Sequence, residues 1–377
     1  MHLSFKVMSA DGVIRLKRGE VIGKRWQVIE KLGEGGCGYV YKVKNIKTGA
    51  KAALKAESNL ILGGSVLKLE VQVLKRLAGR MHVAELLQSA RKETYSYMVM
   101  TLFGRSLNTL LPRSGHTSVS TQVRVGIHIL YGIKQLHEVG YVHRDVKPAN
   151  LLVGRRGREA RIVHLLDFGL AREYVIRNSG TVKIRVPRTN TLFRGTARYC
   201  SVNAHMRGEQ GRPDDLWSMA YVLAEMRGVL PWDKLTNKNE IGQIKKNTLD
   251  SVLFSNSPKQ LLDIATHLRS LNYYTRPDYF QIYKDLESVM EASGFSFNDP
   301  FDWEIRKRRA AKRKKKSKIL KALKTVSTQS ITETEKEERR RMMQCSSDDS
   351  TPSSGNDSTK KRITFKADDF KRNEIGL

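Results

Sequence analysis

The segment at residues 33–38 has the composition of a loop that could bind phosphate. It reads GEGGCG, and Val40 follows it closely. Glycine has no Cβ atom, so a glycine-rich backbone can approach phosphate oxygens closely. The same G-x-G-x-x-G spacing also occurs in dinucleotide-binding turns and in flexible hairpins. Here the glycines lie between two strand-like segments, and the acidic residue expected about 20 positions later on a second strand is not evident, which argues against a dinucleotide site.

Lys55 and Glu70 are charged residues with apolar neighbours. Lys55 ends the run AALK, and Glu70 lies in a helical segment on the same side as Val66 and Val73. A buried ammonium and a carboxylate on an apolar face each need a partner. Pairing the two residues with each other satisfies both groups and leaves the ammonium able to hold phosphates. The alternative is that both side chains are ordinary surface residues.

Two polar motifs follow further along the chain. Residues 143–150 read HRDVKPAN, and residues 167–169 read DFG. The chain therefore contains, in this order, a glycine-rich loop, a strand lysine, a helix glutamate, H-R-D-x-K-x-x-N and D-F-G. This set resembles the protein kinase superfamily.

The resemblance implies transfer of a phosphoryl group, a reaction in which the protein supplies positioning and charge neutralisation. Asp145 would accept the proton of the substrate hydroxyl, and Lys147 would neutralise the moving phosphoryl group. Lys55, oriented by Glu70, would hold the α and β phosphates of ATP. The catalytic residues implied in this way are Asp145, Lys147, Asn150, Lys55 and Glu70.

The cofactors that the resemblance implies are ATP and Mg²⁺. Asn150 and Asp167 would hold the metal through hard oxygen ligands. The adenine would lie between Val40 and Ala53 on one side and Leu152 on the other. The residues expected to contact the nucleotide are Leu32, Gly33, Glu34, Gly35, Gly36, Cys37, Gly38, Val40, Ala53, Lys55, Met100 as the gatekeeper, Leu102, Phe103, Leu152 and Asp167.

The region after D-F-G narrows the resemblance. Where most kinases have A-P-E, this chain has SVN at residues 201–203, within GTARYCSVNAH. The casein kinase I group shares that replacement. FRG at 193–195, GRPDDLWS at 211–218 and DPFDWE at 299–304 are similar to the tau-tubulin kinase branch of the group. A glutamate at the A-P-E position normally pairs with a late arginine, so that pairing is in doubt here.

Lys147 and Thr196 are typical of kinases that act on serine and threonine. The segment 172–198 contains seven basic residues and one acidic residue, and it should border the substrate site. In the casein kinase I group a basic pocket here reads acidic or already phosphorylated residues, and a guanidinium suits phosphate geometrically. The alternative is a solvated loop that happens to be basic. The residues expected at the substrate are Thr196, Arg198, Arg194 and Lys245.

The elements that must position these residues change in type along the chain. Residues 26–100 read as strands with one helix, and helical patterns dominate from about residue 106. This order predicts an α+β fold with two lobes, a small β-rich N-lobe at about 25–100 and a larger helical C-lobe at about 104–304, with a cleft between them. Residues 1–24 would be an extension, and 305–377 a basic, mostly disordered tail.

The chain has 377 residues, with 68 Lys and Arg against 38 Asp and Glu, a formal charge of +30. Its partners should therefore be anionic. No apolar run reaches the roughly 18 residues of a membrane-spanning helix. Three cysteines are too few for a disulfide framework or a zinc site, so we expect a reducing compartment, cytoplasmic or nuclear, and a monomer.

Two other functions compete with that of an active kinase. A pseudokinase scaffold would be expected to lack at least one of the catalytic residues, and none is missing. A polyanion-binding or nucleic-acid-binding protein would explain the charge, because ionic attraction to phosphates is salt-sensitive but general. Residues 304–318 contain ten basic residues in fifteen and could contact a polyanion or a nuclear-import receptor.

Overall fold

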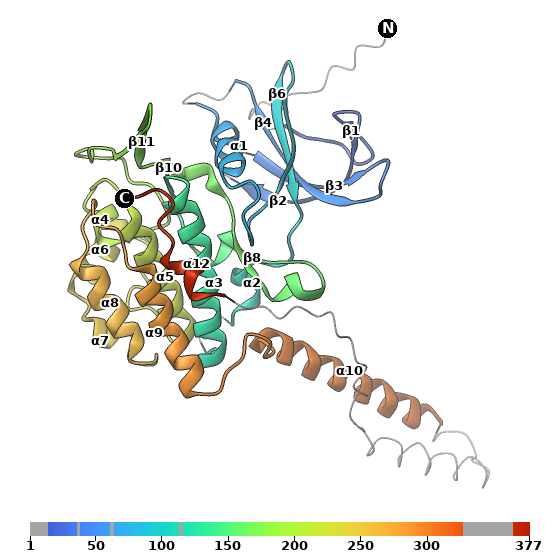
Figure 1. Cartoon of the computed structure of the whole chain (residues 1–377). Helices are drawn as coiled ribbons and strands as arrows, with labels where there is room; N and C mark the ends of the chain where they lie inside the picture. The colour runs from blue at the N-terminus through green and yellow to red at the C-terminus, as the bar shows by residue number, and fades with distance from the viewer. Residues whose placement is uncertain (1–13, 36–37, 61–63, 113–115, 327–364) are drawn as a thin grey trace. The chain divides into compact units, whose positions relative to one another are not determined.

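The computed structural model describes residues 14–35, 38–60, 64–112, 116–326 and 365–377 (Figure 1). Two compact units are present. The first comprises the chain up to Ser296 together with Phe365–Leu377, and the second comprises Phe297–Thr364. The first unit has a β-rich lobe and a helical lobe, so the α+β bilobal fold expected from the sequence is confirmed.

The N-terminal lobe is an antiparallel sheet with the strand order β1-β2-β3-β4-β6-β5. Its core is a cluster of buried apolar side chains that includes Trp26, Val43, Leu54 and Val99. The sheet carries one helix, α1, whose buried positions repeat at helical spacing. The bounds are β1 Val21–Ile22, β2 Trp26–Gly35, β3 Gly38–Asn45, β4 Lys51–Ser58, α1 Val66–Arg76, β5 Leu86–Arg91 and β6 Tyr95–Thr101.

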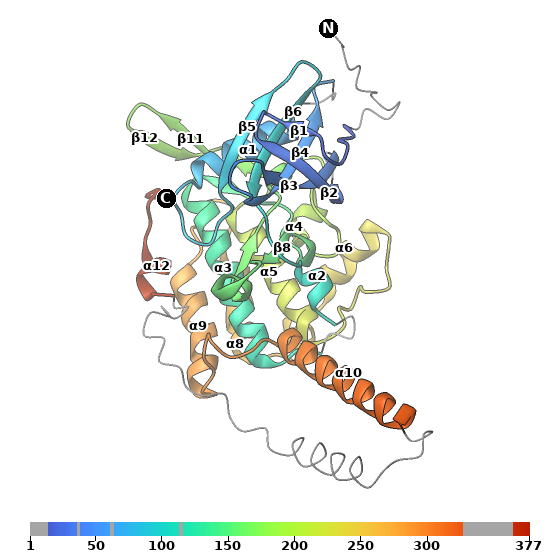
Figure 2. The ribbon, with the colours of Figure 1, turned by 90° about the vertical axis from the view of Figure 1, so that its right-hand side faces the viewer.

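The C-terminal lobe is built around α3, most of whose side chains are buried. Figure 2 shows the sheet at one end of this unit and the helices at the other. The helices are α2 Leu107–Leu110, α3 Val119–Glu138, α4 Val202–His205, α5 Arg212–Arg227, α6 Lys238–Asn247, α7 Asp250–Leu253, α8 Gln260–Ser270 and α9 Tyr279–Ala292.

Short strands in the C-terminal lobe flank the polar motifs. They form three antiparallel pairs, β7 with β10, β8 with β9 and β11 with β12. Their bounds are β7 Tyr141–Val142, β8 Leu151–Val153, β9 Val163–Leu165, β10 Arg172–Glu173, β11 Val175–Asn178 and β12 Thr181–Ile184. Single turns of 3-10 helix lie at Pro148–Asn150, Gly157–Arg161 and Phe168–Leu170.

The C-terminal part of the chain differs from the expectation of a mostly disordered tail. Within the second unit, α10 spans Asp302–Val326, a run of lysine, arginine and alanine with good helix propensity. Phe365–Leu377 belongs to the first unit and contains α12, Ala367–Lys371. Phe365 and Phe370 are both buried and anchor this short segment, which the composition of the tail did not indicate. Residues 327–364 lie outside the described residues.

The helices of the described part of the chain were also compared with the length and hydropathy needed to cross a membrane. None of them meets both requirements.

Candidate active site

Lys55 lies at the centre of a group of charged residues drawn from three elements. Its Nζ is 2.8 Å from Glu70 Oε1 and 2.9 Å from Oε2, so β4 and α1 are joined by an ion pair. Asp167 Oδ1, from the DFG motif, is 3.4 Å from the same nitrogen. The pairing that the sequence suggested for Lys55 and Glu70 is therefore present, and the surface alternative is not.

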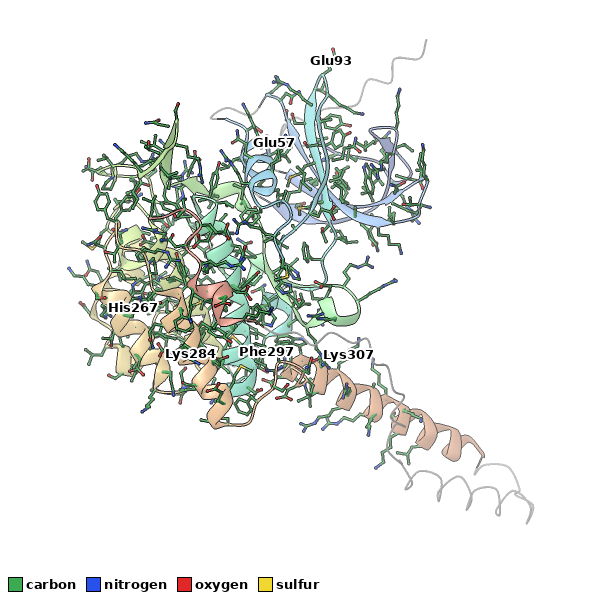
Figure 3. The ribbon with its side chains drawn as sticks, viewed as in Figure 1. Glu57, Glu93, His267, Lys284, Phe297 and Lys307 are labelled. Carbon is green, nitrogen blue, oxygen red and sulfur yellow. The ribbon has the colours of Figure 1, made fainter. Side chains whose placement is uncertain are left out.

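The start of α1 is held so that Glu70 faces Lys55. Ser65 is the N-cap, and its hydroxyl accepts from Lys68 N at 3.0 Å. Glu57 on β4 accepts from the backbone N–H groups of Val66 at 3.0 Å and Leu67 at 3.1 Å (Figure 3). These groups have no partner within a helix, and a carboxylate there also favours the helix dipole. The helix is thus anchored to the strand that carries Lys55.

The pKa values of the two carboxyl groups around Lys55 are shifted in opposite directions. Burial raises the pKa of Glu70 to about 7, and the attraction of Lys55 opposes that shift. Burial alone would also raise the pKa of Asp167, but the charge of Lys55 and the hydrogen bond with Glu70 hold it at about 2. Asp167 is therefore the carboxylate that stays ionised, as a metal ligand requires.

The backbone of the DFG motif is tightly constrained. Asp167 has a φ of 68°, in the left-handed region. A Cβ atom on Gly169 would lie 2.6 Å from Val66 Cγ1 and 3.3 Å from Glu70 Oε1. Only glycine permits this approach to α1. The motif is therefore packed directly against the helix that supplies Glu70.

A second polar group surrounds Asp145. Thr196 Oγ1 donates to Asp145 Oδ1 at 2.7 Å, and Lys147 Nζ is 2.7 Å from Asp145 Oδ2. Lys147 also donates to Thr196 Oγ1 at 2.9 Å. Asn150 Nδ2 donates to the Asp145 backbone carbonyl at 2.9 Å and to Oδ2 at 3.3 Å. The carboxylate of Asp145 is therefore fixed by three side chains, two of them from its own loop.

The loop of Asp145 rests on a buried carboxylate that the sequence had not singled out. Asp215 on α5 accepts from the backbone N–H of His143 at 2.6 Å and of Arg144 at 2.8 Å. Its Oδ2 also lies 2.9 Å from His137 Nε2. Burial alone would raise the pKa of Asp215, but the bond with His137 keeps it below its ordinary value. The two adjacent acidic residues in GRPDDLWS, at the start of a helix, were the sequence feature that could have indicated Asp215.

The residues expected at the adenine share one face of the sheet. In the strand register, Val40 pairs with Lys55 and Ala53 pairs with Met100. Residues paired across antiparallel strands point to the same side. Leu152 on β8 bridges to Ser106, next to the linker that contains Leu102 and Phe103. Gly33, Glu34 and Gly35 pair with Val40, Tyr39 and Gly38 across the glycine-rich hairpin, and Leu32 lies beside them. Gly36 and Cys37 lie outside the described residues.

Comparison of the chain with known proteins identifies its family. Residues 26–286 match the protein kinase domain, which is more than half of the chain. The chain belongs to the protein kinase family. As in kinases generally, ATP and a divalent metal are therefore its cofactors and proteins its substrates.

The relatives of this kinase carry serine/threonine kinase names. A Caenorhabditis elegans protein named as a serine/threonine-protein kinase is 50% identical over 297 residues, 78% of this chain and 86% of the relative. A Dictyostelium discoideum protein named in the same way is 39% identical over 290 residues, 76% of this chain and 58% of the relative. The chain is thus a serine/threonine-protein kinase.

A third relative supports the tau-tubulin kinase branch. It is an inactive tau-tubulin kinase of Caenorhabditis elegans, 38% identical over 250 residues, 63% of this chain and 86% of the relative. The word inactive describes that protein. This kinase retains Lys55, Glu70, Asp145, Asn150 and Asp167.

The SVN sequence that replaces A-P-E has its own polar network in this kinase. Ser201 caps α4 by accepting from Ala204 N at 3.1 Å, and its hydroxyl donates to Asp214. Asn203 Nδ2 donates to Asp214 Oδ1 at 3.2 Å. The buried carboxylate that contacts the SVN sequence is therefore Asp214, which belongs to α5. A late arginine, Arg269, pairs instead with Asp250 at 2.5 Å.

Two of the residues expected at the substrate are occupied by other contacts. Arg198 pairs with Glu225 at 2.5 Å and with Asp233. Lys245 is buried, and its ammonium donates to the backbone carbonyls of Ala197 at 2.8 Å and Cys200 at 2.5 Å. A cation already neutralised, or buried among carbonyls, is a weak anion receptor. These contacts argue against the predicted substrate roles of Arg198 and Lys245.

Arg194 has a different environment. Together with Arg144, Arg172, Arg188 and Leu192 it lines a cavity of about 170 Å³ beside the loop of Asp145. The arginines that share this cavity are therefore others than Arg198. Three of these arginines lie in the basic segment 172–198, and Arg144 comes from the HRD motif.

Proposed function

We propose that this kinase transfers the γ-phosphate of ATP, with Mg²⁺, to serine or threonine residues near acidic or already phosphorylated side chains. The observation that supports this preference most is the arginine-lined cavity. Four guanidinium groups share it, and the nearby carboxylate of Glu209 pairs with only two of them, Arg172 at 3.1 Å and Arg188 at 2.5 Å. An excess of positive charge beside the catalytic loop favours an anionic substrate.

The electrostatics of Arg144 support the same reading. Burial, together with the neighbouring charge of Arg172, lowers the pKa of Arg144 to about 10. A guanidinium whose pKa falls this far is poorly compensated by the anions around it. A substrate phosphate would supply the missing charge and could accept bidentate hydrogen bonds from the arginines.

The side chains around Asp145 suit the chemistry of the transfer. Asp145 would accept the proton of the substrate hydroxyl, since Thr196 and Lys147 hold its carboxylate in place. Lys147 would neutralise charge on the transferred group. Asn150 and Asp167 carry the oxygen ligands that Mg²⁺ prefers, and bound Mg²⁺ neutralises phosphate charge during transfer. Lys55 would orient the α and β phosphates.

The test is phosphate transfer from labelled ATP to three matched peptides, acidic, phospho-primed and neutral. Wild type should label the acidic and primed peptides best, and Asp145→Asn should bind ATP yet lose several orders of magnitude in turnover. Activity of Asp145→Asn equal to wild type would exclude Asp145 as the base. A nucleotide-binding measurement on the variant separates loss of catalysis from loss of folding.

The peptide preference has its own variants. Arg194→Gln should lower kcat/KM for the primed peptide by about tenfold, the value of one charge-assisted hydrogen bond, and change the neutral peptide little. Arg188→Gln should lower it less, because Glu209 already pairs with that guanidinium. Arg156→Gln is the matched control, because Arg156 is an exposed arginine of the β8–β9 connection. An unchanged ranking of the three peptides in both variants would exclude the arginine-lined cavity as the specificity site.

We propose a second, binding function for α10. Its residues 306–316 are strongly basic and mostly exposed, which suits a polyanion or a nuclear-import receptor. Substitution of Lys312, Arg313, Lys314, Lys315 and Lys316 by glutamine should abolish retention on heparin while phosphotransfer persists. Retention equal to wild type would exclude α10 as the polyanion site.

A further inference from the structure

Phe365–Leu377, the C-terminal segment, packs on the C-terminal lobe beside α3 and α9, as the red ribbon in Figures 1 and 2 shows. Phe370 is fully buried and stacks on Tyr283, with ring centroids 4.3 Å apart and planes inclined by 11°. Phe365 is also buried, with its ring 5.0 Å from His128 and 5.2 Å from Tyr131. Phe365 and Phe370 thus pack against side chains of α3 and α9.

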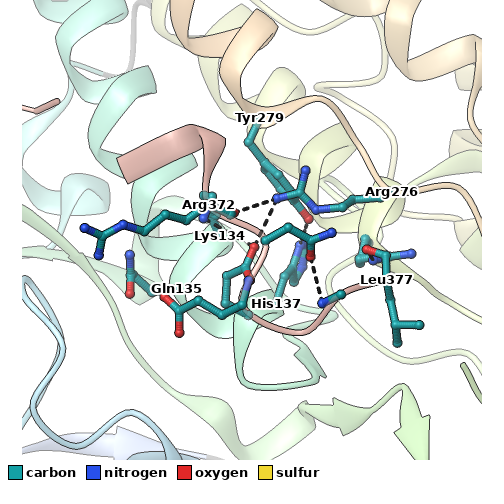
Figure 4. Close-up of polar contacts among 12 residues, drawn as sticks. Lys134, Gln135, His137, Arg276, Tyr279, Arg372 and Leu377 are labelled. Carbon is teal, nitrogen blue, oxygen red and sulfur yellow. Dashed lines mark hydrogen bonds and ion pairs between the residues drawn. The ribbon is translucent and has the colours of Figure 1, made fainter. Parts of the chain in front are cut away.

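The backbone after α12 is held by charged side chains of the lobe (Figure 4). Arg276 Nη2 donates to Arg372 O at 2.9 Å, and the N–H of Glu374 donates to the buried carboxylate of Glu138 at 2.6 Å. The side chain of Glu374 accepts from Arg80 at 3.1 Å, across 294 positions of sequence. These contacts fix the direction of the segment along the end of α3.

The last residues described reach the segment that follows the DFG motif. Ile375 and Leu377 pack against a small apolar cluster formed by Val142, Tyr174 and Val175. Leu377 O accepts from Arg212 Nη1 at 3.0 Å. The segment therefore contacts β7, which enters the catalytic loop, and the start of α5, which supplies Asp215.

These contacts surround the residues that position Asp145. Glu138, which accepts from Glu374, is adjacent in the chain to His137, and His137 contacts Asp215. Asp215 in turn holds the backbone of the catalytic loop. On the other side, Arg80 lies in the turn just after α1, the helix that carries Glu70. One short segment thus touches the supports of both groups of active-site residues.

We propose that residues 365–377 are an intramolecular activating strap, which binds the surface of α3, α9 and the turn after α1 and holds the catalytic loop and α1 in place. The Lys55–Glu70 pair and the Asp145–Thr196 contact are both formed while the strap is bound. The contacts of the strap named above involve none of the described residues that are expected at the nucleotide or in catalysis. An autoinhibitory segment would instead block these residues or separate them.

The proposal of an activating strap depends on the proposed phosphotransfer only where activity is measured. Binding of the strap to the kinase is therefore measured separately. In the full chain, Phe365→Ala with Phe370→Ala should lower kcat/KM by about tenfold and lower the Tm. A synthetic peptide of residues 365–377 should bind this variant, followed by fluorescence anisotropy, and restore its activity. The same peptide with Phe370→Asp should do neither. The control is Asp368→Asn in the full chain, since Asp368 is exposed, and it should change nothing.

Exchange of the charges of Arg80 and Glu374 tests the strap without removing buried aromatic side chains. Arg80→Glu and Glu374→Arg should each lower kcat/KM by a few-fold, and the double variant should recover most of the loss. Failure of the peptide to bind, or binding without any change in activity, would overturn the proposal. So would higher activity of the double alanine variant, which would make the segment inhibitory. If that variant does not fold, absence of recovery in the charge exchange decides against the strap.

Discussion

The ammonium of Lys55 faces both carboxylate oxygens of Glu70, at 2.8 and 2.9 Å, although Lys55 belongs to β4 and Glu70 to α1. The pKa of Glu70, raised by burial to about 7, means that this pair is complete only when the carboxyl group has lost its proton. We therefore expect the Lys55–Glu70 pair to respond to pH near 7.

Glu70→Gln should lower kcat/KM by about tenfold to a hundredfold, because an unpaired Lys55 is displaced from the phosphates. As pH falls through 7, wild-type Glu70 gains a proton and loses its attraction for Lys55, so the ratio of wild-type to variant kcat/KM should decrease between pH 8 and 6. The ratio cancels the ionisation of ATP itself. A ratio that is constant with pH would contradict the raised pKa of Glu70.

Thr196→Ala should lower kcat by about tenfold with little change in the KM for ATP. The substitution removes the hydrogen bond to Asp145 and the contact with Lys147, and neither of these partners is expected at the adenine. Thr196→Ser keeps the hydroxyl and should recover most of the activity. Equal losses in the serine and alanine variants would show that the methyl group, and not the hydroxyl, matters.

Asp215→Asn should both destabilise the kinase and slow catalysis. The amide cannot accept from two backbone N–H groups and His137 as a carboxylate does, so the loss in unfolding free energy should be about 2 kcal/mol. Turnover should fall because the loop of Asp145 loses its support. Asp263→Asn, at an exposed position of α8, is the control. Urea unfolding and kcat for the pair of variants would separate this role from a general effect of charge.

Lys245→Met should change how stability depends on pH. Burial lowers the pKa of Lys245 to about 7, against 10.5 when the chain is unfolded. Between these values the unfolded chain binds more protons, so this lysine makes wild type more stable as pH rises, by up to about 1.4 kcal/mol per unit. The stability of wild type relative to Lys245→Met should therefore increase from pH 7 to 9. Lys246→Met, exposed on the same helix, should show no such trend.

Much of the active site could be predicted because its motifs are local. Lys147 and Asn150 lie within a few residues of Asp145, so their spacing limits where the side chains can be. The pairing of Lys55 with Glu70 followed from a general rule, that buried charges need partners. The two lobes followed from the change of pattern near residue 100, and the fold confirms it.

The substrate side was harder to predict because its partners are distant in sequence. Arg198 was expected at the substrate, but it pairs with Glu225 and Asp233. Glu209, a carboxylate outside every motif, selects which arginines remain in excess around the cavity. Charge counts along a segment cannot show such compensation, since it depends on helices that fold against the segment.

The sequence by itself determined the chemistry of this kinase: the lysine, carboxylates and amide for phosphoryl transfer stand in order along the chain, and their types and spacing need no fold to be read. Only the tertiary structure decided which charges are compensated and that Phe365–Leu377 belongs to the catalytic unit. The physical reason is that the Arg80–Glu374 hydrogen bond and the Phe370–Tyr283 stacking stabilise the fold through burial and direct contact. Both depend on the packing of distant segments, which local sequence patterns do not contain.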